Sequence, residues 1–121
     1  MAAAECEVID LDTYRRGPEL VRVAAAVAAA LFAVGAGHVT APVRGSARAA
    51  LARQVEIYLL HVGFGLDPAT LGRLVGRDRS TVIHACAAIE DRRDQAAFDA
   101  ALGIVEATLR RWAERFAGVR S

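Results

Sequence analysis

A run of 21 residues without a charged side chain, from Val23 to Val43, constrains the fold of this chain more than any other feature. A run of that length can cross a bilayer. Its commonest residue is alanine, however, which is only weakly apolar, and Gly35, Gly37 and Pro42 interrupt it after about four helical turns. We therefore expect a buried helix followed by a loop, and no membrane span.

Glycine, proline and aspartate divide most of the remaining chain into helical segments. Asp67 is placed to cap a helix that begins at Pro68, and Asp78 is placed to cap the next one. The chain has no sustained alternation of apolar and polar residues, which would predict strands, and no Asn-Gly or Asp-Gly hairpin turn. The sequence predicts an all-α fold with helices at about residues 18–34, 47–62, 68–75, 79–92 and 94–119.

Three parts follow from this pattern. Residues 1–17 are polar and acidic and are expected to form a mobile arm, residues 18–93 form a small helical domain, and residues 94–121 form a long C-terminal amphipathic helix. The acidic start differs from the basic region that opens a secretory signal peptide, which favours a cytoplasmic protein. Cys6 and Cys86 leave open one disulfide or two reduced thiols.

Apolar residues recur at alternating steps of four and three along the last segment, which is a heptad pattern. Such a seam needs a surface to pack against. It can fold back on the first helix, or it can form a homodimer or dock on another protein, such as RNA polymerase or a co-regulator. The seam consists of Phe98, Leu102, Val105, Leu109, Trp112, Phe116 and Val119.

The segments 68–75 and 79–92, with the glycine-containing turn between them, have the outline of a helix-turn-helix. Five consecutive polar side chains open the second helix, and proteins that read the major groove place such a turn against base edges. Arginine can bind guanine, aspartate can accept from cytosine, and serine or threonine can bind a base or a phosphate. The same pattern also fits an ordinary solvated helix start. The five residues are Arg77, Asp78, Arg79, Ser80 and Thr81.

The distribution of charge favours the binding interpretation. The net charge is only +1, which excludes a broadly basic, histone-like protein. Residues 44–81 nevertheless hold six arginines against three acidic residues, whereas the first 20 residues are net negative. A phosphate-facing basic patch around the motif is therefore predicted.

Residues 76–90, GRDRSTVIHACAAIE, resemble a known signature. It is G-R-D-H-T-T-V-x-H-A, from the C-terminal DNA-binding domain (domain IV) of the bacterial replication initiator DnaA, and eight of the ten positions from Gly76 to Ala85 match. Ala52-Arg53-Gln54 and residues 66–72, LDPATLG, are similar to further segments of that domain. The resemblance covers about residues 20–95 and implies a DnaA domain IV-like helix-turn-helix that binds double-stranded DNA.

The resemblance also implies roles for the residues that match. Arg77, Asp78 and Thr81 fall on positions that contact bases and phosphates in the family. Arg53 falls on a basic-loop position that approaches the backbone and the minor groove, and His84 falls on a matching histidine with a structural or phosphate-side role. We add Arg79 and Ser80 as base readers, and Arg44 and Arg48 as contacts to the flanking backbone. The full set of candidates is Arg44, Arg48, Arg53, Arg77, Asp78, Arg79, Ser80, Thr81 and His84.

Several positions depart from the family pattern. Arg79 replaces a histidine and Ser80 replaces a threonine, so the preferred DNA site is expected to differ from a standard DnaA box. Ala87 and Ala88 stand where the family often has basic residues. The chain has no lysine and no G-x-x-x-x-G-K-[ST] loop, so no bound nucleotide is expected.

Enzymatic chemistry finds little support in the sequence. The three histidines are scattered without metal-ligand spacing, and Ser80 and His84 lack a third orienting group. We expect no enzyme, no metal and no cofactor. The predicted function is sequence-specific binding of double-stranded DNA. The protein is expected to be a small transcription regulator that contacts a protein partner through residues 94–119. The alternatives are a modulator of replication that competes with DnaA for origin boxes, and a protein-interaction module with a vestigial DNA reader.

Overall fold

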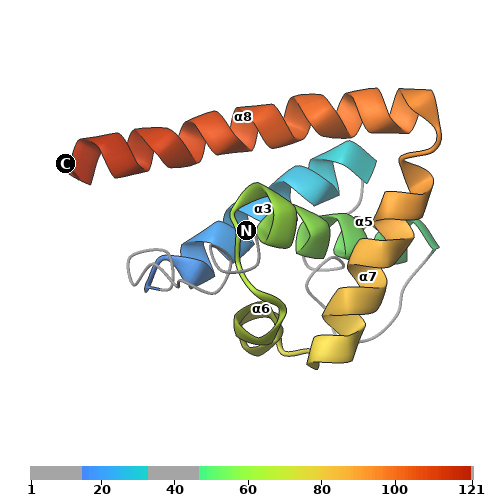
Figure 1. Cartoon of the computed structure of the whole chain (residues 1–121), viewed down its shortest axis with the longest axis horizontal. Helices are drawn as coiled ribbons and strands as arrows, with labels where there is room; N and C mark the ends of the chain where they lie inside the picture. Colours follow the sequence, from blue (N-terminus) through green and yellow to red (C-terminus); the bar gives the residue numbers. More distant parts are fainter. Residues whose placement is uncertain (1–14, 33–46, 121) are drawn as a thin grey trace, which may run out of the picture.

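A computed structural model describes residues 15–32 and 47–120, with side chains up to residue 115, and every element in these ranges is helical (Figure 1). The all-α prediction is confirmed for this part of the chain. None of its helices is both long enough and apolar enough to cross a bilayer. The elements are α3 (Gly17–Phe32), α5 (Ala47–Tyr58), the π-helical turn η1 (Leu59–Gly63), α6 (Pro68–Val75), α7 (Arg79–Arg92) and α8 (Ala96–Arg120).

Alanine side chains form the contact between α3 and α5. Ala24 and Ala28 of α3 and Ala52 of α5 are fully buried. Small side chains let two helix backbones approach closely, and α3 and α5 make the most extensive helix pairing in the described structure. The first half of the uncharged run is therefore a core helix, as predicted; residues 33–46 lie outside the described residues.

The second predicted helix does not continue as an α-helix to Val62. At Leu59 it widens into η1, where the Phe64 amide donates to the Leu59 carbonyl at 3.2 Å. A π-turn accommodates one extra residue and changes the direction of the side chains that follow. Leu59 and Leu60, which are consecutive, are both fully buried as a result, and Leu66 packs in the same cluster as Leu60.

Helices α6 and α7 have the predicted bounds because local signals set their ends. The Asp67 carboxylate accepts from the Thr70 amide at 3.2 Å, and Pro68 occupies the first turn of α6. Gly76 ends α6 with a φ of 71°, a left-handed conformation that glycine adopts without a steric penalty. Gly17, which we placed in the acidic arm, is instead buried at the start of α3, against Leu74.

Helix α8 lies across the other helices and turns its seam toward them (Figure 1). Leu102 and Leu109 are buried in one cluster with alanines of α3, and the Trp112 ring meets the Phe64 ring edge-on, with centroids 6.1 Å apart. Residues 98–112 of the seam fold back within the molecule, but they pack on α5 and η1 as well as on the first helix, α3. The side chains of Phe116 and Val119 lie outside the described residues.

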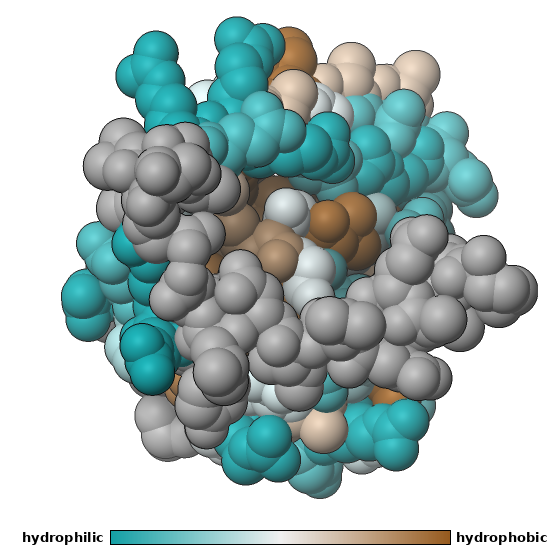
Figure 2. Space-filling view, turned by 60° about the vertical axis from the view of Figure 1, so that its left-hand side comes forward, coloured by the Kyte–Doolittle hydropathy of each residue, from teal (hydrophilic) through white to brown (hydrophobic). Residues whose placement is uncertain are grey.

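Figure 2 faces the end of the molecule where α3 begins and α8 ends. A hydrophobic area is visible there, bordered on its upper side by hydrophilic side chains.

Cys86 is half-buried in α7, and burial raises the pKa of its thiol to about 11. Cys6 lies outside the described residues, as does the rest of the acidic arm up to residue 14.

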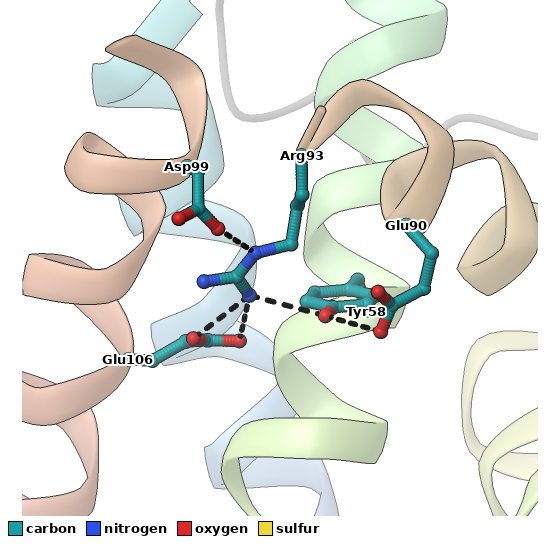
Figure 3. A network of polar contacts seen from close by, with 5 residues as sticks. All are labelled: Tyr58, Glu90, Arg93, Asp99 and Glu106. Carbon is teal, nitrogen blue, oxygen red and sulfur yellow. Dashed lines mark hydrogen bonds and ion pairs between the residues drawn. The ribbon is translucent and has the colours of Figure 1, made fainter. Parts of the chain in front are cut away.

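Arg93 joins α8 to the domain at the turn after α7 (Figure 3). Its Nε donates to Asp99 at 2.6 Å, and its Nη1 donates to both carboxylate oxygens of Glu106 at 2.9 Å and to the Tyr58 hydroxyl at 3.1 Å. Tyr58 in turn donates to Glu90 at 2.7 Å. One guanidinium group thus connects α5, α7 and α8, and burial together with the Glu90 hydrogen bond raises the pKa of Tyr58 to about 12.

Candidate nucleic-acid interface

The first turn of α7 is held by its N-cap. Asp78 Oδ1 accepts from the Thr81 amide and from the Ser80 hydroxyl, both at 2.9 Å. These hydrogen bonds, with the one to the Thr81 amide the largest cause, lower the pKa of Asp78. Asp78 and Ser80 are therefore hydrogen-bonded to each other. As the N-cap, Asp78 orders the side chains that follow it.

Replacing Asp78 tests this cap. In Asp78→Ala the first turn of α7 is expected to fray, because the Thr81 amide loses its acceptor. Amide hydrogen exchange at Thr81 should become several-fold faster. Asp78→Asn keeps a side-chain oxygen and should retain slow exchange; equally fast exchange in both variants would contradict the cap.

The polar side chains that open α7 face solvent. Arg79, Ser80, Thr81 and His84 are exposed, whereas Val82, on the opposite side of the helix, is fully buried. In Figure 1, α8 joins α7 at its far end and runs away from the first turn. The first turn of α7 is thus accessible, which a contact with a large partner requires.

A hollow of about 260 Å³ lies between α5 and the start of α7. It brings together four residues that the sequence analysis assigned to DNA contacts, although they come from two separate segments. Two of these side chains are cationic and two are hydrogen-bonding, a set that suits an oxygen-rich anion such as phosphate. The four are Arg53, Arg77, Thr81 and His84.

The structure places Arg53 in different surroundings from the basic loop that the sequence analysis expected. It lies inside α5 and not in a loop, and only 8% of the residue is exposed. Seven residues into a helix that packs on α3 and α7, its side chain cannot extend as a flexible arm toward a minor groove. It forms part of the wall of the hollow instead.

The sequence analysis did not single out Glu56. This residue is 4% exposed, and it lines a second hollow, of about 180 Å³, together with Arg53 and Arg77. Burial raises the pKa of Glu56 to about 7, although Arg77 and Arg53 act in the opposite direction. Glu56 follows the buried Ala52 by one helical turn, and this spacing was the available signal that it faces inward.

The remaining candidates lie apart from the hollow. Arg48 is exposed in the first turn of α5, Arg79 and Ser80 are exposed on α7, and Arg44 lies outside the described residues. Among the described residues, no group of three or more histidine, cysteine, aspartate or glutamate side chains is placed to hold a metal ion.

Comparisons of this chain with models of known families, with curated proteins and with solved structures found no match.

Proposed function

We propose that this protein binds double-stranded DNA sequence-specifically, with the start of α7 in the major groove. The observation that carries the proposal is the hollow that brings Arg53, Arg77, Thr81 and His84 together beside the exposed first turn of α7. The arrangement of α6, a three-residue turn and α7 supports a helix-turn-helix of the DnaA domain IV kind.

The outer face of α7 has the spacing that groove reading needs. Ser80, Ile83, His84 and Ala87 follow one another at steps of three, one and three, and all four are exposed. An α-helix fits the major groove, and residues spaced in this way face the same base edges. Arg79 flanks this face and is our principal candidate for reading guanine.

The geometry favours different contacts for different candidate residues. Arg79 approaches bases, while the four residues of the hollow, Arg53, Arg77, Thr81 and His84, face a phosphate. Asp78 acts mainly through its cap, which orients Arg79, because its Oδ1 already accepts two hydrogen bonds. Arg48 and Arg44 remain candidates for the flanking backbone.

We further propose that DNA binding serves transcription regulation, with a protein partner such as RNA polymerase or a co-regulator, or a second copy of the chain. Residues 98–112 of the seam pack within the molecule, so a partner of the folded chain would use the outer face of α8. That face includes Ile104, which is 68% exposed. A role in replication and a pure interaction module remain the alternatives.

Selection of bound sequences from random duplex DNA tests the proposal. We expect enrichment of one motif, and Arg79→Ala should weaken binding to it by about 1–3 kcal/mol. Arg79→His should change the preferred base. Arg110→Ala, at an exposed arginine on α8, is the matched control and should leave both affinity and motif unchanged.

The outcome of the selection separates the functional classes. A motif distinct from the DnaA box supports the regulator, and a DnaA-box consensus would favour the replication modulator. No enrichment at moderate salt would overturn DNA recognition altogether. An affinity that is identical for Arg79→Ala and the parent chain would remove Arg79 from the readout.

A further inference from the structure

Glu56 has a buried carboxyl group that takes no part in the proposed DNA contact. It is 4% exposed and lies one turn after Arg53 on α5. Apolar residues of α3 and α6 line its hollow together with two arginines; the apolar residues are Val21, Leu74 and Val75. Burying a carboxylate in such surroundings is costly, so its position calls for an explanation beyond packing.

Arg53 and Arg77 line both hollows, the one that holds Glu56 and the one beside the first turn of α7. The two arginines therefore stand between the buried carboxylate and the surface that we assign to a DNA phosphate. The charged groups that face Glu56 are these two alone among the residues lining its hollow; His84 lines the other hollow only.

We infer that Glu56 makes DNA affinity depend on pH through Arg53 and Arg77. When Glu56 is protonated, it does not offset the positive charge that the two guanidinium groups present to a phosphate. When it is ionised, its negative charge partly cancels theirs and repels the phosphate. The inference rests on the proposed function, and it assigns Glu56 as a positioning and regulatory residue that does not itself touch DNA.

The direction and range of the effect follow from linkage. Burial raises the pKa of Glu56 to about 7, so its charge changes between about pH 6 and pH 8. A bound phosphate adds negative charge nearby and raises that pKa further, so binding takes up a proton and affinity falls as pH rises. If binding shifts the pKa by about one unit, the loss of affinity approaches about tenfold across the titration.

The experiment measures the affinity of the full chain for its selected duplex at pH 6, 7 and 8 and constant ionic strength. We expect the parent chain to weaken by about three- to tenfold from pH 6 to pH 8, and Glu56→Gln to lose most of this dependence. His84→Gln is the comparison, because His84 lines the hollow beside the first turn of α7 but not the hollow that holds Glu56. The His84 variant should keep the part of the pH dependence that Glu56→Gln removes.

A second measurement does not depend on DNA or on a variant. The carboxyl carbon of Glu56, followed by NMR in the free parent chain, should titrate near pH 7 and not near its ordinary value of 4.5. Titration near 4.5, or the same pH dependence in Glu56→Gln as in the parent, would overturn the inference and leave DNA binding intact. Failure to bind any duplex at every pH would instead overturn the proposed function, and the inference with it.

Discussion

Replacing Arg93 with alanine is expected to lower the free energy of unfolding by about 3–5 kcal/mol, because the change leaves a buried carboxylate without its cation. Glu106 is 8% exposed, and both of its carboxylate oxygens accept from Arg93 Nη1 at 2.9 Å. The same nitrogen holds the Tyr58 hydroxyl at 3.1 Å. Urea denaturation followed by circular dichroism measures the loss.

Fluorescence of Trp112, the single tryptophan, reports whether α8 leaves the domain in this variant, because its ring packs on Phe64. Asp99→Asn is the matched control. It removes the other ion pair of Arg93, but the Asp99 side chain is 52% exposed, so a loss of less than about 1 kcal/mol is expected. Equal losses in the two variants would show that Glu106 is not the critical partner.

Gly72→Ala is expected to destabilise the chain by about 1–3 kcal/mol and to weaken DNA binding as well. A Cβ at Gly72 would lie 2.6 Å from the carbonyl oxygen of Arg77, a backbone atom in the turn that positions α7 against α6. Relief of this clash requires movement of the turn, and Arg77 and the first turn of α7 move with it.

Gly103→Ala provides the comparison for Gly72. Its Cβ would meet only Arg93 Nη2, at 3.9 Å, so the substitution should stabilise α8 by about 0.5–1 kcal/mol through helix propensity. Thermal unfolding of the two variants and affinity for the selected duplex distinguish the cases. A Gly72→Ala protein as stable as the Gly103→Ala protein would contradict the tight contact between α6 and the turn.

The bounds of α6 and α7 were predictable from the sequence because their determinants are local. Asp67, Pro68, Gly76 and Asp78 act within one turn of the helix ends that they specify. The heptad seam was also visible, but its spacing did not indicate which surface it packs against. That choice depends on α3 and α5, whose buried alanines lie far earlier in the sequence.

The features that the sequence did not reveal combine distant residues. Arg93 reaches Tyr58 across 35 positions, and no local pattern predicts such a pairing. The widening at Leu59 depends on the burial of consecutive leucines, which is a property of the assembled core. Arg53, Arg77, Thr81 and His84 were singled out from the sequence, but their gathering around one hollow, the burial of Arg53 and the presence of Glu56 behind it required the structure.

Helix α7 spans 14 residues and is therefore a stiff rod about 21 Å long. Its first turn is exposed to solvent. In its last turn Glu90 accepts a hydrogen bond from the Tyr58 hydroxyl, which in turn accepts one from Arg93. Between these ends Val82 and Ile89 are fully buried, so α7 is held along its length against α5 and α6. Because the helix is stiff, the direction in which the exposed turn points is fixed by the packing of the whole helix, including the contacts at its opposite end.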